Sequence, residues 1–215
     1  MPSSAAGSEP TVIPRTLEPE AMDSLEEAVA YDTMDHREVN AAFAKYAVDL
    51  ITRAALSGPL RVLDMGCGTA QIPIALAPLL PDARIDAVDL AQAMLEVGAA
   101  NLRRAGLLDR IALRREDCKA LGAADASYDV VLSNSLLHHV PDPVRPLREA
   151  ARVLREGGVL MFRDLCRPES DAEVEAIVGR YAAGADARQQ ELFRASLNAA
   201  LTAAAASAAA RAAGL

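Results

Sequence analysis

Residues 62–70 constrain the fold of this chain more than any other segment. An apolar run ends in Asp64, a turn with Gly66 and Gly68 follows, and a helix-like segment begins near Ala70. A strand, a glycine turn and a helix in this order open a doubly wound α/β domain, which binds its ligands beyond the carboxyl ends of the strands. Glycine in such a turn lets the backbone approach a ligand that a Cβ would block.

Three kinds of ligand commonly use a glycine turn. A dinucleotide fingerprint needs a third glycine where this chain has Gln71. A P-loop needs a lysine directly after the turn, and the first lysine after Gly68 is Lys119. The third ligand is S-adenosylmethionine, because Asp64-x-Gly66-x-Gly68 resembles motif I of the class I methyltransferases.

The next two predicted strands also end in acids. Residues 84–89 alternate in polarity and end in Asp89, whose carboxylate would lie beside the first turn and accept hydrogen bonds from ribose hydroxyls. An acid at this place also serves NAD enzymes, and capping of the following helix is an alternative role. Residues 111–118 read as a short strand that leads to Asp117.

Two later segments carry the resemblance further. Residues 128–143 contain a buried strand, a polar turn and the run Leu-His-His-Val-Pro-Asp-Pro, which resembles motif IV. Residues 147–164 predict a helix that ends at Gly157-Gly158 and a fifth strand that ends in Asp164. Over residues 61–164 the chain therefore resembles the class I S-adenosylmethionine-dependent methyltransferases, above all the ubiquinone/menaquinone-biosynthesis type. That resemblance implies a three-layer α/β/α Rossmann-like fold with a mainly parallel sheet.

The resemblance also implies which residues contact the cofactor. Asp64 would orient the glycine turn and the ammonium group, Asp89 would bind the ribose, and Asp117 would bind the adenine amino group. Leu90 and Met94 would pack on the adenine, although an ordinary core role is equally open to both. The complete implied set is Tyr31, Asp64, Gly66, Cys67, Gly68, Asp89, Leu90, Met94, Asp117, Cys118 and Asn134.

No catalytic residue follows from the sequence. The methyl group of a sulfonium cation needs no metal activation, and its in-line transfer depends mainly on orientation. A general base would add to this where the acceptor must lose a proton. Four side chains are candidates to face the acceptor, with structural roles as the alternative: His36, His138, His139 and Asp164.

Composition limits the partners. The formal net charge of −8 and the pI near 4.9 lack the basic footprint of a nucleic-acid-binding protein. The cysteines, Cys67, Cys118 and Cys166, lie far apart without zinc spacing, so we expect reduced thiols, no metal and a cytoplasmic protein. We also expect no signal peptide and no membrane span.

The chain divides into three expected parts. Residues 1–20 are rich in proline and predict a disordered arm, 21–58 a helical cap, and 59–215 the cofactor-binding core. The family's C-terminal antiparallel hairpin has no counterpart before Leu215, so we expect a chain that is short at this end. A fifth strand without that hairpin would be an exposed edge, through which two copies could associate.

The sequence thus predicts methyl transfer to a small-molecule acceptor with an O, N, S or C nucleophile. A protein or RNA methyltransferase is one alternative. A non-catalytic cofactor-binding protein or assembly subunit is another.

Overall fold

The core of the protein is a parallel five-stranded sheet in the order β3-β2-β1-β4-β5. The computed structural model describes residues 13–19 and 23–215. Its strands are β1 (Arg61–Met65), β2 (Arg84–Asp89), β3 (Ile111–Arg115), β4 (Tyr128–Asn134) and β5 (Leu154–Arg163). Because β1 lies between β2 and β4, the chain reverses direction across the sheet there, and the crevice beyond β1 is the expected ligand site.

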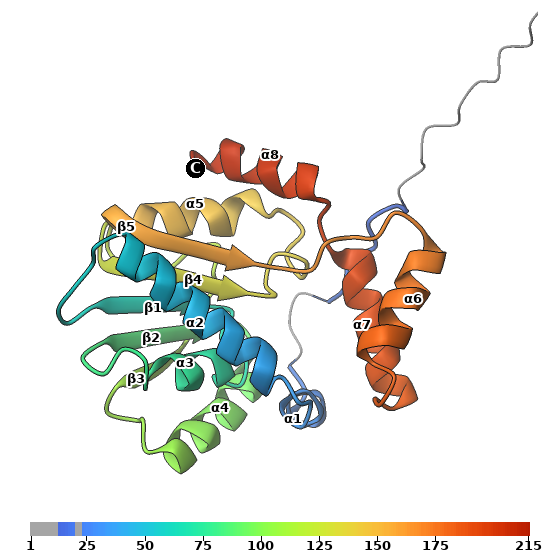
Figure 1. Cartoon of the computed structure of the whole chain (residues 1–215), viewed down its shortest axis with the longest axis horizontal. Coiled ribbons are helices and arrows are strands. Elements are labelled where there is room, and N and C mark those ends of the chain that lie inside the picture. The colour runs from blue at the N-terminus through green and yellow to red at the C-terminus, as the bar shows by residue number, and fades with distance from the viewer. Residues whose placement is uncertain (1–12, 20–22) are drawn as a thin grey trace, which may run out of the picture.

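Helices cover both faces of this sheet (Figure 1). One face carries α2, α3 and α4, and the other carries α5, which gives the three layers that the sequence predicted. The helices are α1 (Leu25–Asp32), α2 (Arg37–Arg53), α3 (Gln71–Leu76), α4 (Gln92–Ala105), α5 (Val144–Val153), α6 (Asp171–Tyr181), α7 (Ala187–Ala199) and α8 (Ala203–Ala213). Among the described residues, no helix is long and apolar enough to cross a membrane.

The alternation of β1 divides its side chains between two cores. Val62 lies in the cluster that faces α2, whereas Leu63 and Met65 lie in the cluster that faces α5. Helix α2 contributes Phe43 and Ile51 to the first cluster, and burying a side chain of this size stabilises the fold by roughly 1.5–3 kcal/mol. The second helix of the expected cap is therefore built into the main core.

After β5 the chain forms a further pair of helices, which lies beyond the carboxyl ends of the strands (Figure 1). Helices α6 and α7 pair there, on the side to which the arrows in Figure 1 point. Helix α8 returns and packs on α5 through a cluster that includes Ala209 and Leu147. Within the described ranges β5 is an edge strand, and it pairs with β4 alone.

The N-terminal segment, residues 13–19, is hydrogen-bonded to the end of α7. The backbone N–H of Thr16 donates to the carbonyl of Asn198, and Nε of Arg15 donates to the carbonyl of Ala199 at 2.7 Å. The sequence predicted a disordered arm over residues 1–20. Residues 13–19 instead have defined contacts, and the rest of that arm lies outside the described residues.

The passage from α5 to β5 differs from the prediction. The helix ends at Val153 and the strand begins at once at Leu154, before the glycine pair that was expected to end the helix. Gly157 has a φ of 74°, and the pairing of β5 with β4 shifts register between Tyr128 and Val130. The glycines therefore form an irregularity inside the strand. Glycine pairs occur both at helix ends and at such irregularities, and the local sequence does not distinguish the two.

Gly158 provides a test of this packing. A Cβ there would lie 2.7 Å from the carbonyl oxygen of Asp129 and 2.9 Å from that of Arg155, so Gly158→Ala forces backbone atoms to move. We expect it to lower the free energy of unfolding by about 1–3 kcal/mol in urea titrations. The control is Gly179→Ala, because Gly179 is exposed inside α6 with no atom within 4 Å of a built Cβ among the described residues. That change should raise stability by up to about 1 kcal/mol, and equal effects of the two substitutions would contradict the packing described.

Candidate functional site

The glycine loop, residues 66–70, folds back onto the end of β2. Gly66, Gly68 and Ala70 all have positive φ, at 73°, 52° and 64°. The backbone N–H groups of Gly66 and Cys67 donate to the carbonyl of Val88 at 2.9 and 3.0 Å. Glycine tolerates this left-handed backbone without steric cost, so the sequence pattern and the loop conformation agree.

Asp89 joins this loop to the start of α4. One carboxylate oxygen accepts from the N–H of Gly68 at 2.8 Å, and the other accepts from the N–H of Ala91 at 2.9 Å. Burial raises the pKa of Asp89, while these hydrogen bonds and the charge of His139 partly offset the rise. Each oxygen keeps a lone pair, so the carboxylate can still accept from two vicinal hydroxyls.

Asp64 is the least satisfied group of the site. Its side chain is 2% exposed, and Oδ2 has no hydrogen-bond partner among the described residues. Burial and the negative charge of Asp89 raise the pKa of Asp64 to about 7. The hydroxyl of Thr69, in the same loop, is likewise buried and unpartnered within the described chain. Such groups are costly unless a ligand completes them, and a ligand with an ammonium group and hydroxyl groups fits both acids.

Two side chains lie against the glycine loop. Tyr31, near the end of α1, would contact a Cβ on Gly68 at 3.8 Å, and a Cβ on Gly66 would meet Cδ1 of Leu136 at 2.8 Å. Burial and the charges of Asp89 and its acidic neighbours raise the pKa of the Tyr31 hydroxyl. Tyr31 therefore lies against the glycine loop and close to its acids, and a contact between Tyr31 and the cofactor stays a prediction.

A polar contact that the sequence did not reveal braces the loop from behind. Asn101, buried on α4, donates to the carbonyl of Thr69 at 3.1 Å and to the carboxylate of Asp32 at 2.8 Å. Gln71 donates to the same Asp32 oxygen at 3.0 Å. The only sequence signal for Asn101 is a polar residue on the buried face of an amphipathic helix.

The remaining predicted cofactor residues are less closely grouped. The carboxylate of Asp117 lies past the end of β3 and is held by the backbone N–H and the ammonium group of Lys119, each at 2.9 Å. Met94 is buried in a cluster with residues of α1, and the side chain of Asn134 accepts from Nε of Arg163 at 2.8 Å. Contacts of these three, and of Leu90 and Cys118, with a cofactor stay predictions.

A histidine pair lies beyond the ends of β4 and β5. His138 is 3% exposed, and its Nδ1 lies 2.5 Å from Oδ1 of Asp164. Asp164 also accepts from the backbone N–H groups of Leu137 and Leu165. The ring of His139 lies 4.0 Å from that of His138. The two predicted acceptor-side histidines and the acid are thus brought together.

The third histidine, His36, lies apart from this pair, whereas Glu18 of the N-terminal segment lies next to His139. His36 precedes α2 and packs against Tyr31, with 5.3 Å between ring centroids. Nδ1 of His139 lies 3.2 Å from Oε2 of Glu18, whose other oxygen accepts from the hydroxyl of Ser196 at 3.0 Å. Sequence reasoning missed Glu18 because it lies about 120 positions before the histidines, in a segment without helix or strand.

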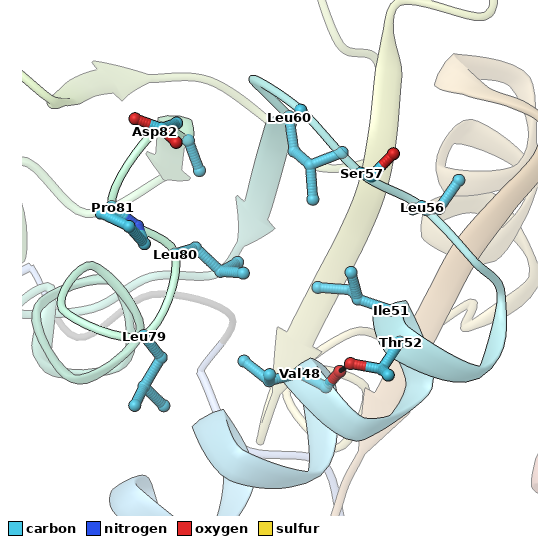
Figure 2. Close-up of a pocket in the computed structure, with 12 residues that line it drawn as sticks. Val48, Ile51, Thr52, Leu56, Ser57, Leu60, Leu79, Leu80, Pro81 and Asp82 are labelled. Carbon is cyan, nitrogen blue, oxygen red and sulfur yellow. Dashed lines mark hydrogen bonds between the residues drawn. The ribbon is translucent and has the colours of Figure 1, made fainter.

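Two surface cavities lie away from both groups. One has a volume of about 280 Å³ and lies between the end of α2 and the turn before β2. Ile51, Leu60 and Leu80 are among its lining residues (Figure 2). It opens at the amino ends of the strands, opposite the glycine loop. A second cavity of about 680 Å³ is bordered by Asp32 and Asn101, on the rear of that loop. Neither is lined by Asp64 or Asp89, the acids of the candidate site.

Comparison with known sequences identifies the class of the domain. Residues 63–162 match the family described as a methyltransferase domain. The 27-O-demethylrifamycin SV methyltransferase of Amycolatopsis mediterranei is 35% identical over 116 residues, 54% of this chain and 42% of that protein. The demethylmenaquinone methyltransferase of Bacteroides fragilis is 26% identical over 145 residues, 66% and 58% of the two chains. Residues 63–162 therefore match a methyltransferase domain, in agreement with the motifs that resemble the class I S-adenosylmethionine-dependent methyltransferases. The chain spans about half the length of these curated relatives.

Comparison of structures supports the fold. The plantazolicin methyltransferase BpumL, solved with S-adenosylhomocysteine, aligns with a TM-score of 0.65 over 86% of this chain and 66% of its own, at 16% identity. The [4+2]-cyclase SpnF aligns with a TM-score of 0.55 over 74% and 64%, at 22% identity. At these identities the likeness concerns the fold alone.

The titration of Asp64 makes cofactor binding depend on pH. Below pH 7 this carboxyl is protonated in the free protein, and an ammonium group bound to it requires loss of that proton. Affinity for S-adenosylhomocysteine should therefore be about tenfold weaker at pH 6 than at pH 8 in calorimetric titrations. In Asp64→Asn the dependence should flatten. A pH dependence unchanged in that variant would show that another group is responsible.

Proposed function

We propose that this protein transfers the methyl group of S-adenosylmethionine to a small-molecule acceptor. The observation that supports this most directly is the pair of acids at the glycine loop, of which Asp64 is buried and Asp89 is partly buried. Asp64 has an unpartnered oxygen within the described chain, and Asp89 has both oxygens anchored by the loop and by the start of α4. This arrangement suits a ligand with one ammonium group and a ribose diol.

The acceptor class is proposed from the relatives and from charge. The relatives with the methyltransferase domain include proteins named for a rifamycin and for demethylmenaquinone. A formal net charge of −8 disfavours the phosphate backbone of a nucleic acid. Cytoplasmic location, and association of two copies through the β5 edge, stay predictions from composition and topology.

The chain's own residues would act mainly by orientation. The bound cofactor supplies a methyl group on a sulfonium, which is already activated for displacement. Asp64 would hold the ammonium group and Asp89 the ribose of the cofactor, and Tyr31 and Leu136 lie against the loop between them. Holding nucleophile, methyl carbon and leaving sulfur in line can lower the barrier by roughly 7–11 kcal/mol.

Binding of the cofactor without methyl transfer is the second candidate. The fold is shared by SpnF, a protein named as a cyclase, so the fold by itself does not fix the reaction. Cofactor binding and methyl transfer therefore need separate experiments.

The first experiment is calorimetric titration with S-adenosylhomocysteine. Asp89→Ala removes the acceptor of the Gly68 N–H as well as the proposed ribose ligand, so binding should weaken by at least about 100-fold. The matched control is Asp82→Ala, an exposed acid in the turn before β2, which should bind as the unmodified protein does. Circular dichroism checks that both variants are folded. Equal binding by the two variants, or no binding by the folded unmodified protein, would overturn the cofactor assignment.

The second experiment measures transfer. The protein is incubated with cofactor tritiated in the methyl group and a panel of phenols, quinols, amines and thiols. Extraction of label into at least one acceptor, lost in Asp89→Ala, is the expected result. Binding of S-adenosylhomocysteine without transfer to any acceptor of the panel would favour the second candidate.

A further inference from the structure

The surroundings of the histidine pair suggest a ligand beyond the cofactor. Glu18, His138 and His139 each offer one ligand atom, and these atoms all lie within 4.8 Å of one another. They come from two segments separated by about 120 positions. We propose that these three side chains form a binding site for a divalent transition metal ion, with Zn²⁺ as the ion that the donor set favours.

The hydrogen bonds of His138 fit this role. Asp164 accepts from the backbone N–H groups of Leu137 and Leu165, and its Oδ1 lies 2.5 Å from Nδ1 of His138. In the tautomer that donates from Nδ1 of His138 to Asp164, the lone pair on Nε2 remains for a ligand. A carboxylate that fixes the tautomer of a metal-binding histidine is the usual second partner in zinc sites.

The geometry of Glu18 and His139 also fits. Nδ1 of His139 and Oε2 of Glu18 are 3.2 Å apart. Ligands at about 2.0–2.1 Å from a tetrahedral zinc ion are separated by about 3.3 Å, so this pair needs little adjustment. The third ligand atom has to close from within 4.8 Å by about 1.5 Å. The side chain of Glu18 can make part of that movement by rotation about its own bonds.

The site is held together by two other side chains. Arg15, three positions before Glu18, donates from one guanidinium nitrogen to the carbonyls of Leu137, His138 and Val140 at 3.0–3.2 Å. Ser196, on α7, donates to the second oxygen of Glu18. These bonds fix the N-terminal segment to the loop that carries both histidines, so the ligands are brought together by tertiary contacts.

The donor chemistry selects the ion. Two imidazoles and one carboxylate suit Zn²⁺ better than Mg²⁺ or Ca²⁺, which prefer all-oxygen sites. The charges also balance, because two carboxylates, Glu18 and Asp164, face one divalent ion and two neutral imidazoles. Three protein ligands leave a fourth position open, as in catalytic rather than structural zinc sites.

The open fourth position could bind the methyl acceptor, an inference that rests on the proposed function. The site lies beyond the carboxyl ends of β4 and β5, at the same edge of the parallel sheet as Asp89, the last residue of β2. An acceptor hydroxyl or thiol bound at the fourth position would lose its proton to solvent and keep its lone pair for the methyl carbon. The new C–O or C–S bond forms as the bond from methyl to the sulfonium breaks, and a thioether leaves. The acceptor class thereby narrows to hydroxyl or thiol compounds.

The test uses the full chain after treatment with a chelator, in a buffer with a thiol-free reductant. Titration with Zn²⁺ in a calorimeter should show one equivalent bound, and Co²⁺ should give the visible absorption of a four-coordinate site. His139→Ala should weaken Zn²⁺ binding by at least about 100-fold, and Asp164→Asn by about 10–100-fold. His36→Ala and Cys166→Ser are the controls, because neither residue belongs to the ligand group, and both should bind as the unmodified chain does.

Absence of saturable Zn²⁺ binding, or binding that His139→Ala leaves intact, would overturn the metal site. Loss of binding in Cys166→Ser would do the same, by placing the ion on a thiol. Each variant is also titrated with S-adenosylhomocysteine, which shows that it is folded. Normal S-adenosylhomocysteine binding without Zn²⁺ binding removes only the metal site, whereas Zn²⁺ binding without S-adenosylhomocysteine binding removes the proposed function and leaves the metal site.

Discussion

The repulsion between the carboxylates of Asp64, which is buried, and Asp89, which is partly buried, is the constraint on which the site depends. Parallel pairing of β1 with β2 brings both acids to the same edge of the sheet, and the glycine loop closes over them. Asp89 is compensated by two backbone N–H groups, whereas Asp64 keeps an unpartnered oxygen among the described residues and has its pKa raised to about 7. Burying an acid without a partner lowers the stability of the fold. Such an acid therefore indicates a site where a cationic group of a ligand binds.

Much of this arrangement could be predicted from the sequence because it is local. Apolar runs that end in Asp64 and Asp89, with glycines after the first, specify two parallel strands and the turn between sheet and helix. The later strands were predicted from the same kind of pattern, whereas their spatial order in the sheet was not. The prediction for the end of α5 was wrong, because Gly157 forms an irregularity inside β5 and does not cap the helix. Asp117 was placed at the correct edge, but its ion pair with Lys119 depends on a side-chain conformation that sequence does not encode.

The acceptor side could be predicted only in part, because it is assembled from distant segments. His138, His139 and Asp164 were recognised as candidates from their positions after β4 and β5. Their contacts with Arg15 and Glu18 could not be predicted, because Arg15 and Glu18 are ordinary polar residues of a proline-rich stretch. Asn101 was missed for a related reason, because a buried amide that braces a loop looks like any polar residue in a helix. Local patterns identify strand ends, and tertiary contacts decide which of those ends share a ligand.

A crystal structure of the full chain with S-adenosylhomocysteine tests the central claim most directly. The account predicts that the ammonium group lies within hydrogen-bond distance of Oδ2 of Asp64, that the ribose hydroxyls lie on Asp89, and that the thioether sulfur faces the loop after β4. A ligand bound in either of the two surface cavities, or an Asp64 carboxyl still without a partner in the complex, would contradict it.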